Sequence, residues 1–295
     1  MRSSLDCIPC FARQALEAAR FVTGDPAIHE RVVRDVLRHA ADMDLAQCPP
    51  AFAQRIHRQL RSLTGIADPY QAVKHRFNRM ALAMLEDLGS QVRQSVSPLA
   101  TALRLAIAGN VIDLGVNGGI TEPEVRRCIG SAMSEPFCGD VEAFANALAD
   151  ARSILYLADN AGEIVFDRLL IEQLPLERVT LAVRGSAILN DATLVDAQAA
   201  GLCDLVGVID NGSDAPGTIL DDCSQSFRNR FAEADLVIAK GQGNYETLGE
   251  VDANLCFLFK AKCPVIAGRV RQPVGTHILL MRPCPQPATL KGKPK

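Results

Sequence analysis

The second half of the chain carries a series of short apolar runs, and this series constrains the fold more than any other feature of the sequence. The runs lack alternation of polar and apolar residues, which is typical of strands buried on both faces. They span residues 154–157, 179–183, 205–209, 236–239, 265–267 and 278–281. We therefore predict a strand at each of these runs.

Helical patterns separate several of the predicted strands, at residues 163–174, 193–200 and 227–234. Alternation of strands and helices predicts a parallel sheet with helices on both faces. Residues 1–105, by contrast, contain helical patterns and no obvious strand. We therefore expect an α/β fold, in which a three-layer α/β/α core with a mainly parallel sheet spans residues 106–295. A helical domain is expected over residues 1–105.

The charge balance and the apolar segments argue against several classes of protein. Lysine and arginine total 31 and aspartate and glutamate total 34, a formal net charge of −3, which disfavours a dedicated nucleic-acid surface. The longest apolar stretch, at residues 98–109, is too short to span a membrane and contains Arg104. The first residues lack the apolar core of a signal peptide. We expect a cytoplasmic protein that binds neither nucleic acid nor membrane.

Polar residues follow the predicted strands at the points where the strands end. In an open parallel sheet these carboxyl ends meet at one edge, which is where ligands bind. The groups are Asp159-Asn160 with Glu163, Arg184 with Asn190-Asp191, Asp210-Asn211-Gly212, and Lys240-Gly241-Gln242-Gly243-Asn244. Each group alone has the composition of an ordinary turn, whereas their convergence on one edge favours a site.

The residue types in these groups suit a phosphoryl site. Carboxylate and amide oxygens are the ligands that Mg²⁺ and Mn²⁺ prefer. A lysine beside a glycine-rich turn suits a phosphate, because such a turn offers backbone N–H groups. Together they indicate metal-assisted phosphoryl chemistry, in which a cation neutralises the phosphate and activates water.

The order of these motifs resembles that of the damage-control phosphatase family, formerly catalogued as domain of unknown function 89. The resemblance covers nearly the whole chain, and the N-terminal cysteine pair is similar to that of the branch found in bacteria, archaea and plants. It rests on the strand-end groups together with Cys7-Ile8-Pro9-Cys10, Phe11, Arg13, Gln14, Asp68-Pro69-Tyr70, Lys74, Asn78 and Gly109-Asn110-Val111-Ile112-Asp113.

The resemblance implies a metal-dependent phosphatase for damaged or surplus phosphometabolites, such as sugar phosphates and pantetheine-type phosphates. The divalent cation (Mg²⁺, Mn²⁺, Co²⁺ or Ni²⁺) would be held by Asp159, Asn160 and Asp191, and Lys240 would bind the phosphate. These four residues form the implied catalytic set, and the implied substrate-binding set is Lys240, Gly241, Gly243, Asn244, Asn110, Asp113, Glu163 and Arg184. The chain departs from the family at Lys-Gly-Gln-Gly-Asn, where many relatives carry Lys-Gly-Asp-Leu-Asn.

Two other enzyme classes compete with this interpretation. A phosphatase that forms an aspartyl-phosphate also places an aspartate after its first strand, but it carries a second aspartate where this chain has Ala161. A nucleotide- or S-adenosylmethionine-binding enzyme, such as a carboxyl methyltransferase, would use Gly241 and Gly243 as the start of a GxGxxG motif. The sixth position of that motif is Glu246, and the motif follows a late strand, so the signal is weak.

The N-terminal half leaves two further possibilities open. Cys7 and Cys10 have the spacing of half a zinc site or of a redox dithiol, with Cys263 as a candidate third partner, while a purely structural role fits as well. The helical half is a candidate lid over the sheet edge, from which Lys74 and Asn78 would reach the substrate.

Overall fold

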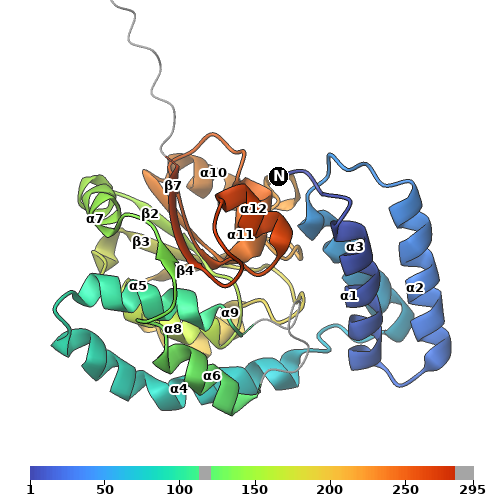
Figure 1. The fold of residues 1–295 in the computed structure, drawn as a ribbon, viewed down its shortest axis with the longest axis horizontal. Helices are drawn as coiled ribbons and strands as arrows, with labels where there is room; N and C mark the ends of the chain where they lie inside the picture. Colours follow the sequence, from blue (N-terminus) through green and yellow to red (C-terminus); the bar gives the residue numbers. More distant parts are fainter. Residues whose placement is uncertain (113–120, 283–295) are drawn as a thin grey trace, which may run out of the picture.

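A computed structural model describes residues 1–112 and 121–282 of the chain, and its centre is a single seven-stranded sheet (Figure 1). The order of the strands across the sheet is β1-β7-β6-β5-β2-β3-β4. The strands are β1 (Phe137–Cys138), β2 (Ile154–Leu157), β3 (Val179–Val183), β4 (Gly207–Asp210), β5 (Leu236–Lys240), β6 (Leu255–Lys260) and β7 (His277–Arg282). All neighbouring strands pair in parallel except β6 and β7, which are antiparallel. The mainly parallel sheet is therefore confirmed.

The strand order reverses direction between β2 and β5, which are neighbours in the centre of the sheet. From β2 the chain continues outward through β3 and β4, and from β5 it continues to the other side through β6 and β7. Connections that leave in opposite directions open a crevice outside the carboxyl ends of the two strands, and this is where open α/β sheets bind ligands. The fold therefore directs attention to the residues that follow β2 and β5.

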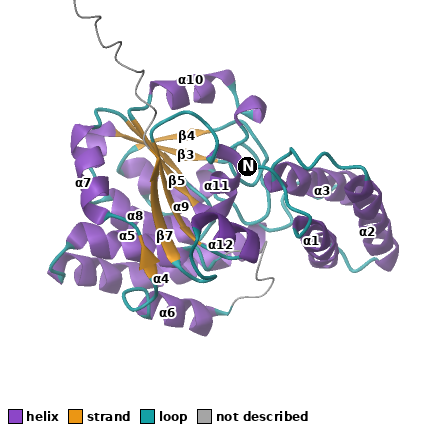
Figure 2. Cartoon of the chain, turned by 45° about the horizontal axis from the view of Figure 1, so that its top comes forward, coloured by secondary structure: helices purple, strands orange, loops and turns teal. Residues whose placement is uncertain are grey.

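Helices cover both faces of the sheet, as expected for three layers (Figure 2). Along β2, Ile154 and Tyr156 face one hydrophobic cluster, and Leu155 and Leu157 face the other. The first layer contains α4 (Gln71–Gln94), α5 (Pro98–Gly109), α6 (Glu122–Gly130), α7 (Val141–Asp150), α8 (Glu163–Ile171) and α9 (Leu194–Ala199). The second contains α10 (Gln225–Glu233), α11 (Gly241–Leu248) and α12 (Pro264–Val270).

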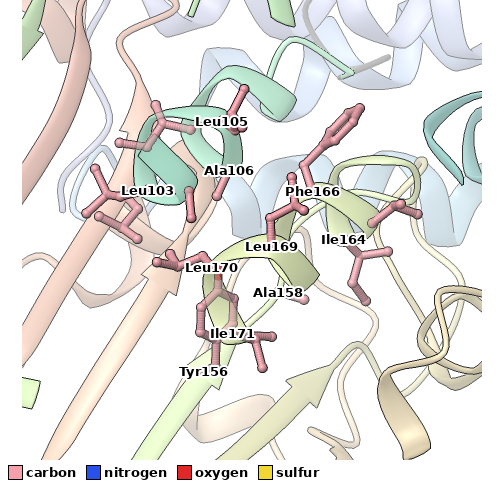
Figure 3. Close-up of a cluster of buried hydrophobic side chains, with 14 of the residues drawn as sticks. Leu103, Leu105, Ala106, Tyr156, Ala158, Ile164, Phe166, Leu169, Leu170 and Ile171 are labelled. Carbon is pink, nitrogen blue, oxygen red and sulfur yellow. The ribbon is translucent and has the colours of Figure 1, made fainter. Parts of the chain in front are cut away.

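Helix α8 is enclosed between the sheet and the helices α4 and α5 (Figure 3). Phe166, Leu169 and Leu170 are all buried, and a Cβ atom on Gly109 of α5 would lie 2.7 Å from the Phe166 ring. All residues of α8 except Arg168 are buried, so any other polar side chain that the helix carries needs a partner inside the protein. Glu163 is the first residue of this helix, at the edge of the predicted site.

One strand prediction was wrong, and two strands were missed. The run at residues 265–267 lies in α12, because Pro264 occupies the first helical position, where its missing N–H costs nothing. The strand beside it, β6 (Leu255–Lys260), was not predicted, although its apolar residues form an unbroken buried run like those of the other strands. The short edge strand β1 was also missed, since a two-residue strand leaves no pattern in the sequence.

The N-terminal helices form a unit with a core of its own. Helices α1 (Cys7–Val22), α2 (Pro26–Ala41) and α3 (Pro49–Thr64) enclose a separate hydrophobic cluster, in which the rings of Phe11 and Phe52 stack 4.4 Å apart. Helices α4 and α5, by contrast, belong to the main cluster on the sheet. The hydrophobic cores thus divide between α3 and α4, while the predicted domain boundary at residue 105 stays a prediction. No helix among the described residues is long and apolar enough to cross a membrane.

Polar contacts attach this helical unit to the segment that follows β4. The amide of Gln54 donates hydrogen bonds to Asp214 (2.6 Å) and Asp222 (2.8 Å), and Arg58 Nε donates to Asp214 (3.0 Å). Arg61 pairs with the same Asp214 carboxylate. Helix α3 is therefore held on the α/β unit by one carboxylate that accepts from three of its side chains.

Candidate active site

The loops that follow β2 and β3 meet at the edge of the sheet. Asn160 and Asp191 form an isolated antiparallel bridge, and the backbone N–H of Ala192 donates to the carbonyl of Asp159 at 2.7 Å. The structure thereby brings together the three residues that the sequence assigned to a metal. All three side chains are buried or nearly so, at the crevice where the strand order reverses.

Arg184, at the end of β3, lies between the two aspartates. Its Nε donates to Asp191 Oδ2 at 2.7 Å, and its Nη2 lies 3.6 Å from Asp159 Oδ1. Arg184 is only 2% exposed, yet Nη2 makes no hydrogen bond. Nη2 therefore has only the longer ion pair with Asp159, and its N–H groups can donate to a further acceptor.

Two asparagine amides form a layer beneath Asp159. Asn110 Nδ2, from the end of α5, donates to Asp159 Oδ2 (3.0 Å) and to Glu163 Oε2 (2.8 Å). Asn160 Nδ2 donates to the same two carboxylate oxygens, at 2.8 and 3.1 Å. Four hydrogen bonds from two amides therefore fix the position of the Asp159 carboxylate relative to Glu163.

Lys240, the last residue of β5, is completely buried behind this layer. Its ammonium group donates to the carbonyl of Ala106 (3.0 Å), to Glu163 Oε1 (2.7 Å) and to Asp167 Oδ1. Since an ammonium group has three N–H bonds, all of them are used, and the arrangement does not support the predicted contact between Lys240 and a phosphate. The lysine instead holds Glu163, and through it the two amides.

Asp167 is a member of the site that the sequence analysis missed. It lies four residues after Glu163 on α8, so the two carboxylates project from the same face of the helix toward Lys240. The hydroxyl of Tyr156, from β2, donates to Asp167 Oδ1 at 2.9 Å. The available signal was the spacing of Glu163 and Asp167 on a helix whose other residues, apart from Arg168, are apolar, since two acidic residues on a buried face favour a shared cation.

Gly241 brings the start of α11 against Asp159. A Cβ atom on this glycine would lie 1.9 Å from Asp159 Oδ2, and its φ of +80° is one that other residues rarely adopt. The glycine-rich segment is thus the first turn of a helix rather than the predicted loop. Only a residue without a side chain permits this close approach to the carboxylate.

The site carries more buried negative than positive charge. Burial, and then the nearby carboxylates Glu163 and Asp191, raise the pKa of Asp159 well above its usual range, although Lys262 and Arg184 partly offset them. Burial raises the pKa of Asp167 to about 7 against the opposing effect of Lys240. Carboxylates without enough cations are the arrangement that a divalent cation would relieve. The buried carboxyl groups are those of Asp159, Glu163, Asp167 and Asp191, and the buried cations are those of Arg184 and Lys240.

The donor atoms available for a cation are two carboxylates and one amide. Asp159, Asn160 and Asp191 offer oxygen ligands, the chemistry that Mg²⁺ and Mn²⁺ prefer, and so they fit a hard divalent cation. Within residues 1–112 and 121–282, no three His, Cys, Asp or Glu side chains are grouped as a metal site. The amide oxygen of Asn160 would be the third ligand beside the two carboxylates.

The comparisons with known proteins agree over almost the whole chain. The family model described as the damage-control phosphatase ARMT1-like domain matches residues 3–278. A protein named damage-control phosphatase from Archaeoglobus fulgidus is 34% identical over 285 residues, which cover 94% of this chain and 98% of the relative. The chain belongs to the damage-control phosphatase ARMT1-like family. The family resemblance read from the motifs is thereby confirmed, and the branch with the N-terminal cysteine pair stays a prediction.

Other family members support the same assignment. A damage-control phosphatase from Pyrococcus horikoshii is 32% identical over 287 residues, covering 95% of this chain and 98% of the relative. An uncharacterized protein from Methanocaldococcus jannaschii is 35% identical over 289 residues and covers 94% of each chain. The crystal structure of a DUF89 family protein from Pyrococcus horikoshii has a TM-score of 0.83 and 30% sequence identity, covering 95% of this chain and 99% of that chain. The fold is therefore that of the damage-control phosphatases.

The remaining family motifs occupy structural positions around the site. Asn244 is fully buried, where it donates to the carbonyls of Lys240 (2.7 Å) and Ala158 (3.3 Å), and Gly243 lies in the first turn of α11. Lys74 and Asn78 are buried and bonded to protein partners, so their predicted contact with a substrate stays a prediction. Asp113 lies outside the described residues.

The cysteine pair begins the first helix of this family member. Cys7 is the first residue of α1, and its sulfur accepts a hydrogen bond from the backbone N–H of Ser4 at 3.4 Å. Burial raises the pKa of Cys7, and Glu246, Cys263 and Cys10 raise it further. Within residues 1–112 and 121–282 no group of three His, Cys, Asp or Glu side chains could hold a metal, so a third partner for the pair stays a prediction. The raised pKa of Cys7 disfavours the reactive thiolate that a redox dithiol needs. A structural role is therefore favoured.

The buried ion pairs of Lys240 give a test of its place in the site. We expect Lys240→Met to lower the free energy of unfolding by about 3–5 kcal/mol at pH 7.5, since it leaves two buried carboxylates without a cation. Without the lysine the pKa of Asp167 rises further, so the folded variant binds more protons than the unfolded chain. Its stability should therefore recover in part at pH 5.5. Urea unfolding at both pH values measures this.

A matched variant separates burial from loss of charge. Lys260, at the end of β6, pairs with Glu135 at 3.8 Å nearer the surface, so Lys260→Met should cost less than about 1 kcal/mol. A Lys240→Met variant as stable as the wild type would contradict the enclosed position of this ammonium group.

Proposed function

We propose that this protein is a divalent-metal-dependent phosphatase that hydrolyses small phosphomonoesters. The observation that carries the proposal is the meeting of Asp159, Asn160 and Asp191 at the crevice of the sheet, beside a buried guanidinium with an unused N–H. The names of the archaeal relatives support a phosphatase with a damage-control role. The substrates that we propose are phosphorylated metabolites such as sugar phosphates and pantetheine-type phosphates.

The proposed division of labour follows from the contacts. Asp159, Asn160 and Asp191 would hold the cation, whose chemistry is to neutralise phosphate charge and to make water more acidic. Arg184 would bind a phosphate oxygen through Nη2, and so stabilise the charge that develops in the transition state. Asn110 and Glu163 keep the Asp159 carboxylate in position, and Lys240 anchors Glu163 from behind.

A phosphatase screen tests this function directly. Purified protein would be assayed against a panel of phosphometabolites with Mg²⁺, Mn²⁺, Co²⁺ or Ni²⁺, and again with a chelator. We expect phosphate release that requires a divalent metal and that the chelator abolishes. Turnover that is indifferent to the chelator would contradict the metal-dependent mechanism.

The geometry weighs against the two competing enzyme classes. A nucleotide- or S-adenosylmethionine-binding enzyme would need the turn at Gly241 for its ligand. Gly241 packs directly against the Asp159 carboxylate, and this negative charge would repel a diphosphate. For the aspartyl-phosphate class, Ala161 is fully buried at the position where a second aspartate is needed. Binding of S-adenosylmethionine in calorimetry, or a trapped phosphoenzyme, would revive one class or the other.

A further inference from the structure

Two motif residues on α4 have no part in the function proposed above. Lys74 and Asn78 lie one helical turn apart, so they share a face of α4, and α4 packs against α8 and α9, which follow the loops after β2 and β3. Lys74 is 3% exposed and Asn78 is 2% exposed. Two buried polar side chains on one helix face need partners, and the identity of the partners indicates what they do.

Asn78 connects the loop after β2 with the helix that follows the loop after β3. Its Oδ1 accepts a hydrogen bond from the backbone N–H of Gly162 at 2.6 Å, two residues beyond Asn160. Its Nδ2 donates to Asp196 Oδ1 at 2.8 Å. Asp196 lies in the first turn of α9, shortly after Asp191. One amide thus spans both segments that carry the proposed metal ligands.

Asp196 caps the start of α9, and Lys74 neutralises the charge of the Asp196 carboxylate. Asp196 Oδ2 accepts from the backbone N–H and the hydroxyl of Thr193, at 2.9 and 2.8 Å, which forms a capping box. Lys74 Nζ lies 2.9 Å from the same oxygen and 3.7 Å from Asp68 Oδ2. The segment from Asp191 to Asp196 is therefore fixed to α4 by charge and by hydrogen bonds together.

We infer that Asn78 is a positioning residue for the divalent cation, because it fixes the spacing between the Asp159–Asn160 segment and the Asp191 segment. The inference rests on the proposed function. The backbone bridge between the loops sets their register, and the amide of Asn78 restricts the remaining movement of Gly162 relative to α9. Groups that orient the ligands of a metal typically change its affinity by 10- to 100-fold when they are replaced.

Manganese binding to the metal-free protein tests the inference without relying on turnover. Mn²⁺ would be titrated into the wild type and Asn78→Asp, followed by electron paramagnetic resonance. A carboxylate at position 78 keeps the acceptor for Gly162 but faces the carboxylate of Asp196, so we expect affinity to fall about tenfold. The double variant N78D/D196N restores a donor and acceptor pair, and it should recover most of this loss.

Two further variants make the outcome decisive. Asn78→Ser cannot span the two segments and introduces no charge, so it should weaken Mn²⁺ binding even if Asn78→Asp does not fold. Asp235→Ala is the matched control, because it removes hydrogen bonds to the backbone N–H groups of Arg152 (2.9 Å) and Ser153 (3.1 Å) at the opposite ends of the strands. It should bind Mn²⁺ like the wild type.

The outcomes separate the two proposals. Wild-type affinity in a folded Asn78→Ser variant, or a double variant as weak as Asn78→Asp alone, would overturn the positioning role and leave the phosphatase proposal standing. A wild type that binds no Mn²⁺ would overturn both. A thermal melt of each variant is the check on folding. A midpoint well above the titration temperature verifies that the protein measured is folded.

Discussion

Asp159→Asn is expected to lower phosphatase turnover by about 1,000-fold or more while the fold stays intact. The substitution removes the negative charge at the centre of the proposed cation site and keeps the shape of the side chain. Asp159 lies after the end of β2 and outside the hydrophobic clusters, so the packing of the sheet does not depend on its charge. Steady-state kinetics at saturating Mn²⁺ measure the loss.

The same variant should make the metal-free protein slightly more stable. Burial, Glu163 and Asp191 all disfavour the charged form of Asp159, which is why its pKa is raised, and a neutral amide removes that repulsion. We expect a gain of about 1 kcal/mol, equivalent to a rise of about 2 °C in Tm. Asp235→Asn, at the opposite ends of the strands, should change neither activity nor the metal response. Full metal-dependent turnover in Asp159→Asn would contradict the assignment.

Gly241→Ala is expected to abolish activity and to destabilise the protein by several kcal/mol. The new Cβ would lie 1.9 Å from Asp159 Oδ2, and the φ of +80° is unfavourable for alanine, so the carboxylate or the first turn of α11 must move. Movement of the carboxylate would separate Asp159 from the amides of Asn110 and Asn160. Movement of the turn would displace Lys240, the residue that caps α11. Denaturant unfolding measures the loss of stability, and phosphate release from the same preparation measures the loss of activity.

Gly65 supplies a matched control for this substitution. It has a similar φ of +70° at the end of α3, but a Cβ there would meet nothing within 4 Å. Gly65→Ala therefore isolates the backbone cost, about 1 kcal/mol, and should leave turnover unchanged. If both glycine variants lost the same stability and kept activity, the close packing of Gly241 on Asp159 would be refuted.

The sequence predicted the edge at which the polar groups meet, because parallel strands end on one side of a sheet. Asp159 and Asp191 are far apart in the chain, yet consecutive parallel strands place their loops side by side. The strand pattern was less reliable where local chemistry overrode it. Apolar residues 265–267 became helical because a proline precedes them in the first turn.

The position of Lys240 shows what the sequence could not predict. A lysine at a strand end has the same local pattern whether its ammonium group faces solvent or the interior. Its burial follows from α8, which is apolar on nearly every side and presents Glu163 and Asp167 to β5. Such a pairing depends on which helix packs on which strand, and that is settled by the tertiary fold.

Because the N-terminal helices have a core of their own, they can separate from the α/β unit without losing that core. Helices α1 to α3 bury their own side chains, and the Asp214 carboxylate accepts from Gln54, Arg58 and Arg61 across the contact with the α/β unit. The ion pair of Arg58 with Asp214 is partly open to solvent, since the Arg58 side chain is 51% exposed, and salt weakens such a contact far more than it weakens an apolar interface. The rate of amide hydrogen exchange in α1 to α3 should therefore increase with ionic strength, while the exchange rate in the central strands stays the same.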